Sequence, residues 1–498
     1  MGWLLKAAGG SLALAAGIAF TGLMTSTGYG DTAATTQAIT DAAKTTAEAI
    51  TAAAPAAPAA SAVNTGSTTW LMISAALVLF MVPGLAFFYG GMVRAKNVVN
   101  TFLMVMACIG LVGVLWTAVG YAMTFAVAPT EKGADGKEFV TPTYFNFDSN
   151  LMFLKHFGAP SESSAGYKAI VTSGDTVGAV PTGVPEIVFF CFQGMFAIIT
   201  PALIIGAVAE RVRFGPFLLF VGLWALLVYN PVAHWVWNTS GWLFQKGVMD
   251  FAGGTVVHVL AGVSGLAACL VIGKRKGYDG KTPTMPHSIG LTLIGAGLLM
   301  VGWFGFNAGS AIAVPGSEHP VAGEVAALAF TTTFIAACTA SFVWLLVEWA
   351  FTGKPTSLGF ASGLVAGLVA ITPCAGHVSP TAALIIGALG GAVCFFGCRI
   401  KYIFGYDDSL DAFGVHGIGG ALGALLVGIF AIRPVTGSMS QLWLQFQGMA
   451  ISAIYAFVVS LVLCLIIHKT IGMRATPEQE DKGMDVALHG EEGYHQAR

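Results

Sequence analysis

Long apolar runs separated by short polar segments make up most of the chain from Trp70 onward. Each run is close to the ~20 residues that a helix needs to cross the hydrocarbon core of a bilayer. In lipid only helices and closed barrels satisfy their own backbone hydrogen bonds, and runs of this length favour helices. The pattern predicts eleven transmembrane helices, at about residues 69–92, 98–126, 184–209, 215–234, 254–273, 285–309, 323–351, 357–373, 379–398, 413–432 and 441–468.

The segment before the first predicted span has two parts. Residues 1–27 contain a short apolar run after a lysine, which is typical of a signal peptide, although an uncleaved anchor stays open because no clean cleavage site follows. Residues 28–68 are rich in Ala and Thr and are interpreted as a flexible exported tail. The rest divides into a membrane domain, 69–470, and a C-terminal tail, 471–498.

Basic residues are distributed unequally between the predicted loops. If the first span enters from outside, inside loops collect residues such as Arg94, Arg211, Lys274 and Arg399. Most basic residues on the other side lie in the N-terminal tail or in the polar loop at about 127–183, where the positive-inside rule counts them little. We therefore predict an external N-terminus and a cytoplasmic C-terminus.

An odd number of spans with an external start favours two five-helix halves of inverted topology plus one extra helix. The fifth predicted span begins with Asp250-Phe-Ala-Gly-Gly-Thr-Val-Val-His258, and the tenth begins with Asp411-Ala-Phe-Gly-Val-His416-Gly. In both, an acidic residue precedes a glycine and then a histidine inside the membrane. Transporters with inverted repeats place their binding site where such corresponding helices meet near the midplane.

Composition narrows the class of protein. The 498 residues are 56% hydrophobic and 10% charged, with a mean hydropathy of +0.77, whereas a soluble domain is about a quarter charged. We therefore predict one all-α integral membrane domain. A net charge of −2 argues against binding of nucleic acid, which needs a basic face. The sequence contains no P-loop, nucleophile elbow or metal-ligand cluster, so we predict neither an enzyme nor a cofactor or metal site.

Two histidines within predicted spans, His258 and His416, are the main candidates for chemistry. An ionisable side chain within a span usually faces the bundle interior and functions there. Two imidazoles in contact could fix each other's tautomers and pass a proton along. The alternative is two unrelated core histidines, each bonded to a backbone carbonyl.

Asp250 and Asp411 each lie at the start of a predicted helix, where a carboxylate can cap free N–H groups and meet the positive end of the helix dipole. For Asp411 we predict capping. Asp250 lies near the external mouth, and two roles stay open for it: a structural cap, or electrostatic stabilisation of an entering cation.

Aromatic residues gather near the external ends of several spans. Trp237 lies where interfacial tryptophans are common, yet an indole face also binds small cations. Phe192 and Phe196 are one turn apart on one helix face, and Phe304 and Phe306 lie in the segment Gly302-Trp-Phe-Gly-Phe-Asn-Ala-Gly-Ser310. Core packing is the alternative for these phenylalanines.

Five segments together resemble the ammonium transporter family, and they occur in its order along the chain from about Trp70 to the C-terminus. They are Asp250-Phe-Ala-Gly-Gly-Thr-Val-Val-His258, Gly302-Trp-Phe-Gly-Phe-Asn-Ala-Gly-Ser310, Phe413-Gly-Val-His416-Gly, Phe88-Tyr-Gly-Gly-Met-Val-Arg and Gly206-Ala-Val-Ala-Glu-Arg-Val-Arg-Phe214. The resemblance implies a homotrimer with one narrow pore in each subunit. It also implies roles for eight residues: an outer cation site of Trp237, Phe192 and Ser310 beside the structural acid Asp250, a phenyl gate of Phe196 and Phe306, and paired pore histidines His258 and His416.

The function implied is uptake of ammonium across the inner membrane. Ammonium would be deprotonated near the gate, and ammonia would pass the histidines with or without a relayed proton. The tail from Pro477 to Tyr494 resembles the bacterial family's cytoplasmic tail, where a PII-type signalling protein binds. Two alternatives are an ammonium sensor that signals through a partner and a Rhesus-like channel for ammonia or carbon dioxide, which the presence of Trp237 disfavours.

Overall fold

The structure is a computed structural model in which two compact units, Met1–Ser61 and Ala62–Arg498, are distinguished. The described residues are 65–132, 138–155, 169–171, 181–280, 284–313 and 322–494, together with Gln37 and Lys44. In the first unit only Gln37 and Lys44 are described, and both are helical. The predicted signal peptide and nearly all of the predicted exported tail therefore lie outside the described residues.

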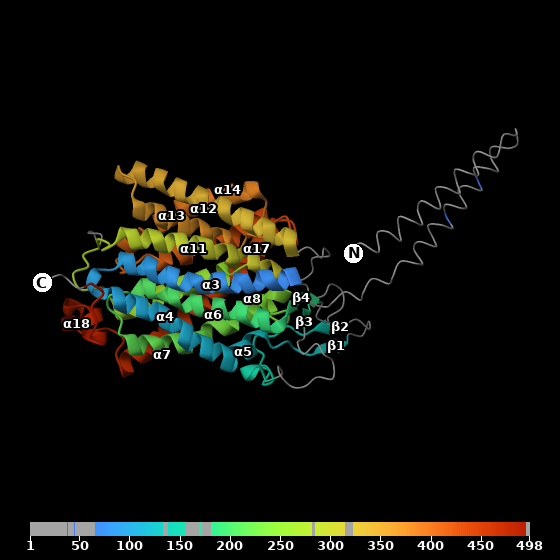
Figure 1. The fold of residues 1–498 in the computed structure, drawn as a ribbon, viewed down its shortest axis with the longest axis horizontal. Helices are drawn as coiled ribbons and strands as arrows, with labels where there is room; N and C mark the ends of the chain where they lie inside the picture. The colour runs from blue at the N-terminus through green and yellow to red at the C-terminus, as the bar shows by residue number, and fades with distance from the viewer. Residues whose placement is uncertain are drawn as a thin grey trace, which may run out of the picture. The chain divides into compact units, whose positions relative to one another are not determined.

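Helices form nearly all the regular structure of the second unit (Figure 1). Among the described residues, ten helices are long and apolar enough to cross a membrane, which confirms the prediction of an all-α membrane protein. The remaining predicted span, at about 357–373, corresponds to α13 (Ser357–Ile371), an apolar helix of 15 residues. The α-helical parts of the ten spans are α3 (Thr65–Met92), α4 (Val98–Leu115), α5 (Tyr121–Phe125), α6 (Glu186–Val208), α7 (Phe214–Trp224), α8 (Asn230–Trp237), α10 (Leu260–Ile272), α11 (Ile289–Gly309), α12 (Ala322–Thr352), α14 (Pro380–Gly397), α15 (Ile400–Phe404), α16 (Ile418–Phe430) and α17 (Met439–Thr470).

Four of these spans contain a π-helical segment, in which the backbone hydrogen bonds skip one residue more than in an α-helix. The segments are η2 (Trp116–Gly120), η4 (Ala225–Tyr229), η5 (Gly254–Val259) and η7 (Phe413–Gly417). Such segments are rare and often lie at functional sites. The remaining short helical elements are η1 (Ala95–Asn97), η3 (Met152–Leu154), α9 (Trp242–Gln245), η6 (Ser310–Ala313), α18 (Pro477–Lys482) and η8 (Asp485–His489).

The polar loop between α5 and α6 carries the strands of the described residues, which the sequence patterns did not predict. Strand β1 (Thr130–Lys132) pairs antiparallel with β2 (Glu138–Val140), so that Thr130 lies opposite Val140. Strand β3 (Ala169–Val171) pairs antiparallel with β4 (Pro181–Pro185), with a register shift between Ala169 and Val171. These hairpins are too short to alter the all-α architecture.

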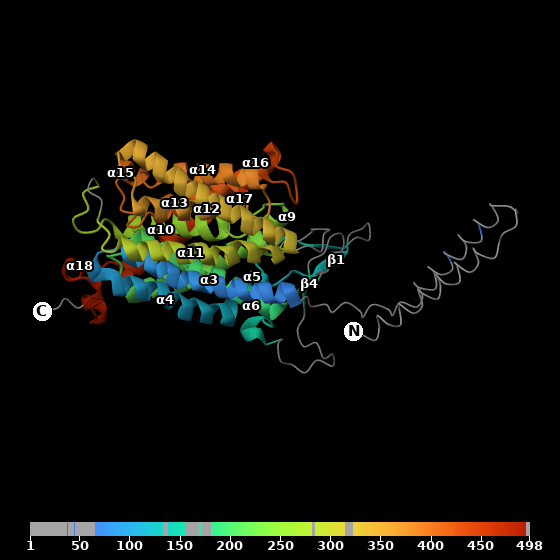
Figure 2. The ribbon, with the colours of Figure 1, turned by 45° about the horizontal axis from the view of Figure 1, so that its top comes forward.

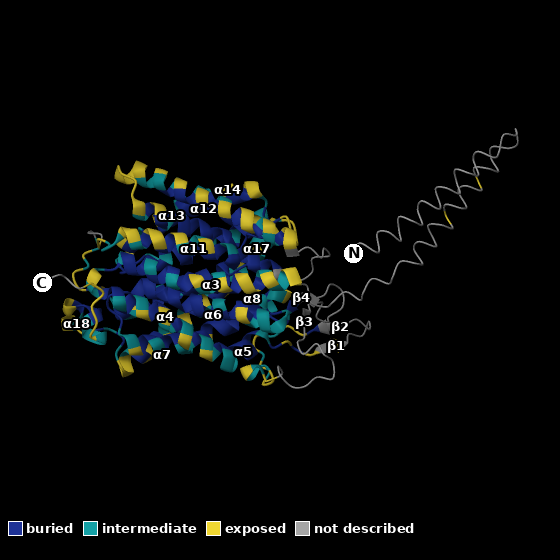
Figure 3. Ribbon diagram, in the orientation of Figure 1, coloured by how far each residue is buried: buried dark blue, intermediate teal, exposed yellow. Residues whose placement is uncertain are grey.

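The helices of the second unit run side by side, with their buried faces turned toward one another (Figures 2 and 3). Large apolar side chains on the outer faces are exposed, among them Phe342 on α12 at 61% and Ile454 on α17 at 65%. Soluble monomers rarely expose apolar surface on this scale, so these faces suit a bilayer or another copy of the chain.

Glycines allow α3 and α11 to pack closely. A Cβ at Gly295 of α11 would lie 2.2 Å from the backbone nitrogen of Phe88, and one at Gly302 would lie 2.2 Å from the side chain of Met81. Small residues of this kind bring transmembrane backbones together where no hydrophobic effect drives them. Gly295 and Gly302 therefore have a packing role.

A buried ionic network joins four loops at the end of the bundle that carries the C-terminal tail. The Arg275 guanidinium contacts Glu210 at 2.9 Å and Asp407 at 2.8 Å, and Arg94 contacts Glu210 at 2.9 Å. Burial alone would raise the pKa of Glu210, but the charges of Arg275 and Arg94 outweigh it and lower that pKa to about 2. Because the folded pKa is depressed, the stability that Glu210 contributes is present above its usual pKa of 4.5 and is lost as the pH falls toward 2.

The C-terminal tail lies against the loop between α3 and α4. The Asp485 carboxylate accepts hydrogen bonds from the backbone N–H groups of Val99 at 3.0 Å and Asn100 at 2.8 Å, and so caps the start of α4. Lys96 donates to the backbone carbonyl of Glu480 at 2.8 Å. The tail is therefore bonded to a loop of the membrane domain.

Replacing Arg275 with Met is expected to lower the free energy of unfolding by about 3–5 kcal/mol, because Glu210 and Asp407 would keep buried charges without their shared partner. The measurement is denaturant unfolding in detergent. Lys354→Gln, which removes an exposed charge, serves as the control and should change stability by less than about 0.5 kcal/mol. Equal stability of the two variants would contradict the role given to the network.

Candidate functional site

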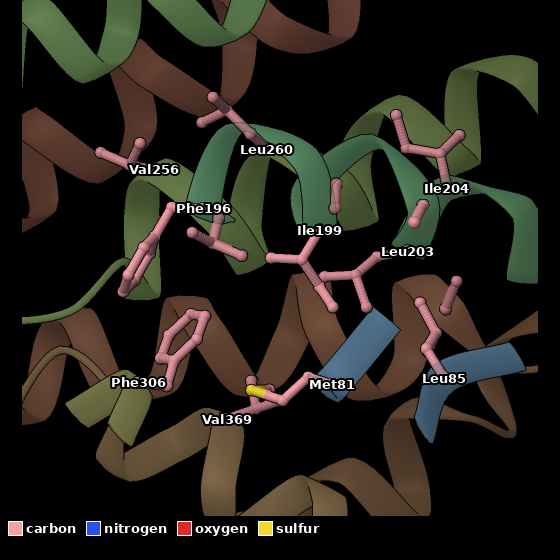
Figure 4. Close-up of a cluster of buried hydrophobic side chains, with 14 of the residues drawn as sticks. Met81, Leu85, Phe196, Ile199, Leu203, Ile204, Val256, Leu260, Phe306 and Val369 are labelled. Carbon is pink, nitrogen blue, oxygen red and sulfur yellow. The ribbon is translucent and has the colours of Figure 1, made fainter. Parts of the chain in front are cut away.

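Aromatic side chains from three helices meet where α6, α8 and α11 come together. The rings of Phe196 and Phe306 lie 4.3 Å apart between centroids, tilted by 33° (Figure 4). Trp237, at the end of α8, meets Phe196 edge to face at 5.8 Å, and Phe192 lies 4.9 Å from Phe196. Apart from Trp237, which is partly buried, these rings are buried. The structure therefore brings together four aromatic residues singled out from the sequence.

Asp250 precedes η5 and is bonded on two sides. Its carboxylate accepts N–H bonds from Gly253 at 3.1 Å and from Thr255 and Val256 at 3.0 Å, as a cap does, and its backbone carbonyl accepts the Trp237 indole N–H at 2.9 Å. Asp250 therefore holds both the start of η5 and the orientation of Trp237. Burial raises the pKa of Asp250 to about 6, although the bonds from the backbone N–H groups oppose the shift.

Ser310 follows the last residue of α11, and its side chain is buried. Its hydroxyl donates to the backbone carbonyl of Phe306 at 2.8 Å, which leaves the oxygen lone pairs free to accept. The neighbouring Gly309 packs against Phe192, since a Cβ there would lie 2.8 Å from that ring. Ser310 thus sits beside the aromatic group.

His258 and His416 touch each other in the interior of the bundle. Their Nδ1 atoms are 3.2 Å apart and their rings are nearly parallel, at an interplanar angle of 19°. One Nδ1 must therefore donate while the other accepts, which couples the two tautomers. On its other side His258 stacks on Trp303 at 5.3 Å, and the Trp303 indole N–H donates to the Thr372 hydroxyl at 2.8 Å.

The histidines meet because two glycines let their helices cross closely. Gly262 lies four residues after His258, and a Cβ there would be 2.3 Å from the backbone nitrogen of Gly417. Gly420 lies four residues after His416, and a Cβ there would be 2.9 Å from the Cβ of His258. Each helix thus offers a glycine, one turn after its histidine, to the other helix.

The predicted cap at the second of these helices is wrong. Asp411 does not cap η7: its carboxylate pairs with Lys401 at 2.6 Å. The cap is Asp408, whose carboxylate accepts N–H bonds from Ala412 at 3.0 Å and Phe413 at 2.8 Å. Asp408 is therefore the counterpart of Asp250. In a run of three aspartates within five residues, the sequence could not show which carboxylate turns back onto the helix.

A narrow, almost entirely apolar cavity is lined by Phe306 and by both histidines. Figure 4 shows Phe306 in a cluster of buried apolar side chains, several of which come from α3 and α6. The residues that line the cavity are Met81, Leu85, Phe88, Ile199, Leu203, Val257, His258, Leu299, Trp303, Phe306, Val365 and His416. His258 Nε2 is buried and has no hydrogen-bond partner among the described residues. Two imidazoles are thus the polar groups of a cavity that otherwise offers hydrocarbon and aromatic surface.

Within the described residues no three His, Cys, Asp or Glu side chains come together in a way that could hold a metal ion. The polar groups near the cavity are instead arranged in sequence: Asp250 and Trp237 at one end, the two histidines in the middle, and Asp408 near the end that carries the tail. Such an order suits a small solute moving along the bundle.

Sequence reasoning missed two residues that position the site. Trp303, which orients His258, lies within a segment used for the family resemblance, so its signal was available. No sequence signal marked Asp408 as the cap, because capping depends on backbone geometry. The π-helical form of η5 and η7 was also not predicted; their glycines were the only hint.

Comparison with known proteins identifies the family and its fold. A sequence profile described as Ammonium Transporter Family matches residues 69–494. The chain belongs to this family.

Its relatives and structural neighbours agree with this family assignment. The ammonium transporter of Bacillus subtilis is 44% identical over 439 residues, which are 86% of this chain and 98% of the relative. That of Mycobacterium tuberculosis strain H37Rv is 42% identical over 453 residues, 86% of this chain and 90% of the relative. Candida albicans Mep2 superposes with a TM-score of 0.70 at 29% identity, covering 84% of this chain and 88% of that structure. A protein described as Sensor Amt Protein gives 0.72 at 27%, covering 85% and 98%. The family is one of transporters rather than enzymes.

In this family member, Gly262→Ala is expected to destabilise the bundle by about 1–3 kcal/mol, because the new methyl group would meet the backbone of η7 and force the histidine helices apart. Denaturant unfolding in detergent measures the change. Gly290→Ala on α11 is the matched control, since nothing lies near the position of its Cβ. If both variants unfold alike, the close crossing of the two helices does not contribute as described.

Proposed function

We propose that the protein takes up ammonium through a pore within the subunit: the cation binds beside the aromatic group, loses a proton there, and crosses the apolar cavity as ammonia. The observation that supports this most is the cavity itself, which continues from the Phe196–Phe306 gate to two histidines in a lining without charge. A bare cation is strongly disfavoured on such a path, whereas neutral ammonia is not.

The outer site would bind the cation with three kinds of group. The Trp237 face supplies cation–π attraction, Phe192 adds a second ring, and the Ser310 oxygen accepts an N–H bond. Asp250 contributes negative charge nearby and orients Trp237 through its carbonyl. This assignment gives Asp250 both roles that its position in the sequence left open.

Loss of a proton also explains how such a pore could select its substrate. Ammonium and potassium ions are close in size, so a hole of fixed radius separates them poorly. Potassium has no proton to give and would have to cross the cavity as a cation. The His258–His416 pair could accept and donate N–H bonds to ammonia along the way, and could also carry a proton.

We extend the proposal to the whole chain on the strength of the family resemblance. Residues 1–27 are a signal peptide, 28–68 an exported tail, 69–470 the membrane domain with its N-terminus outside, and 471–498 a cytoplasmic tail. The protein lies in the inner membrane of a bacterium. Three copies assemble, each with its own pore. The cytoplasmic face, where α18 and η8 lie against the α3–α4 loop, receives a PII-type protein.

A role as ammonium sensor is the second candidate. The chain is similar along 85% of its length to a protein described as Sensor Amt Protein, with a TM-score of 0.72. In such a role the same outer site would bind ammonium, and the docked tail would pass the signal to a separate partner.

The proposal is tested by recording currents on solid-supported membranes from purified protein in liposomes during an ammonium jump. Wild type is compared with the double variant His258→Ala/His416→Ala, and a potassium jump is the control. We expect a current with ammonium that the double variant loses, because the histidine pair carries the proton. No current, with ammonia entry still detected by an internal pH dye, would show a neutral pathway. Equal potassium and ammonium currents would rule out selection by deprotonation, and no transport of either kind would favour the sensor.

Trp237→Leu is expected to raise KM for methylammonium, since loss of a cation–π contact of about 0.5–2 kcal/mol weakens binding by about 2- to 30-fold. Initial uptake rates over a concentration series measure it. Trp443→Leu, which removes an exposed tryptophan from α17, is the matched control and should leave KM unchanged. An unchanged KM in Trp237→Leu would exclude the indole from the outer site.

A further inference from the structure

A second concave site lies beside the histidine helices and shares no lining residue with the cavity described above. Its volume is about 340 Å³, which falls in the range of pockets that hold small molecules. The site lies between η5 and α10, α14, η7 and α16, and α17, and Figure 2 shows α14, α16 and α17 together at one side of the bundle. We call it the apolar groove. Its lining includes Val259, Val263, Phe413, Gly417, Leu422 and Ala453.

The apolar groove lies at the depth of the hydrocarbon core and opens onto the surface of the bundle. All of its lining residues are apolar or glycine, and all belong to helices long enough to cross a membrane. Val259 and Gly417 are buried, whereas the other lining residues are partly exposed. A bound water needs two to four polar partners, which this lining does not offer. The groove is therefore suited to hydrocarbon.

One end of the apolar groove leads to a lysine on the side of the bundle that carries the tail. Phe413 lines the groove, and the ring of Tyr406 meets it edge to face at 6.4 Å between centroids. Next to Tyr406, a Cβ at Gly405 would lie 3.7 Å from Lys274 Nζ. Lys274 is exposed, and it makes no ion pair with any residue that the structure describes. An uncompensated positive charge thus lies close to the end of an apolar channel.

The surface beside this lysine is also apolar. Ile403 and Phe404 of α15 are 78% and 76% exposed. Asp411, the acid closest in sequence to the groove, is already paired with Lys401 at 2.6 Å. Lys274 is therefore placed as lysines are at the boundary of a bilayer, with apolar surface on one side and its ammonium free to meet a phosphate.

We propose that the apolar groove binds one acyl chain of a phospholipid from the tail-side leaflet, and that the phosphate of this lipid lies at Lys274. A phospholipid carries both groups that the site accommodates, a long hydrocarbon chain and an anionic phosphate. A second copy of the chain could also cover an apolar groove. The lipid accounts in addition for the lysine without an ion partner at the end of the groove.

The bound acyl chain lies against the residues that follow both histidines. Val259 follows His258 and Gly417 follows His416, and both residues line the groove. Side chains that border an empty space lose their dispersion contacts on that side, and an acyl chain restores them. The lipid therefore supports the crossing of the histidine helices from the membrane side. This role does not depend on what passes through the cavity.

The first experiment locates the acyl chain. Purified protein is reconstituted in liposomes that contain phosphatidylglycerol with a photoactivatable diazirine in one acyl chain, and mass spectrometry maps the adducts after irradiation. We expect adducts on the lining residues of the groove. Ala453→Phe should lose them, because the new ring fills the groove. Ile454→Phe is the matched control, since Ile454 is the next residue of α17, is 65% exposed and lies outside the groove.

The second experiment tests the phosphate. Native mass spectrometry in detergent measures Kd for phosphatidylglycerol and for a diacylglycerol with the same two chains. Wild type should bind phosphatidylglycerol about 5-fold more tightly, the effect of one lysine close to a lipid phosphate. Lys274→Gln should bind both lipids alike. Lys354→Gln, which removes an exposed lysine from the loop between α12 and α13, should behave as wild type.

Several results would contradict the proposal. Adducts spread evenly over the exposed face of α17, with the same yield in Ala453→Phe, would indicate ordinary surrounding lipid. A lack of adducts on the lining residues in wild type would indicate that a second copy of the chain covers the groove. Equal affinities of wild type for the two lipids would exclude the phosphate from Lys274. The affinity comparison leaves the groove intact, so it decides even if Ala453→Phe does not fold, and no measurement requires ammonium transport.

Discussion

The contact between His258 and His416 depends on how closely two transmembrane helices can approach. Two glycines, Gly262 and Gly420, lie one turn after the histidines and remove the side chains that would hold the backbones apart. The rings then reach a separation of 3.2 Å between nitrogens, which forces one to donate and the other to accept. Because hydrocarbon surroundings offer no water to replace that hydrogen bond, breaking the contact between the imidazoles would be costly. The histidine pair lines the cavity, and the aromatic group adjoins that cavity through Phe306.

Charged side chains lie toward the two ends of the bundle, and the cavity between them is uncharged. Full charges lie at the two ends, where Asp250 and Asp408 cap helices and where Arg275, Glu210 and Asp407 form a compensated network. Between the ends the lining offers only imidazole and apolar surface. A path with anionic ends and an uncharged middle attracts a small cation and disfavours its passage in charged form. The arrangement therefore suits a solute that can change its charge by giving up a proton.

The π-helical segments connect this electrostatic arrangement to the fold. Each of η5 and η7 follows an aspartate whose carboxylate accepts two or three backbone N–H groups, and each continues into an ordinary α-helix after the histidine. The capping carboxylate fixes where each helix starts. The π-helical turn that follows is wider than an α-helical turn, so it changes the direction in which the next side chains point. Trp303 completes the setting of His258 by stacking on the ring while its own N–H is held by Thr372.

The fold class and the family of this protein could be predicted from its sequence alone. The length of the apolar runs indicated an all-α membrane bundle, because hydrocarbon leaves a backbone few other ways to bond itself. The order of five motifs indicated the family, and the resemblance implied roles for the aromatic residues and for the two histidines. Other features were decided only by the tertiary structure. Asp408 rather than Asp411 caps η7, because capping depends on where a chain turns and not on the identity of three similar acids. Likewise, the reach of His258 to His416 follows from a crossing of helices 158 residues apart in the chain, which no local pattern records.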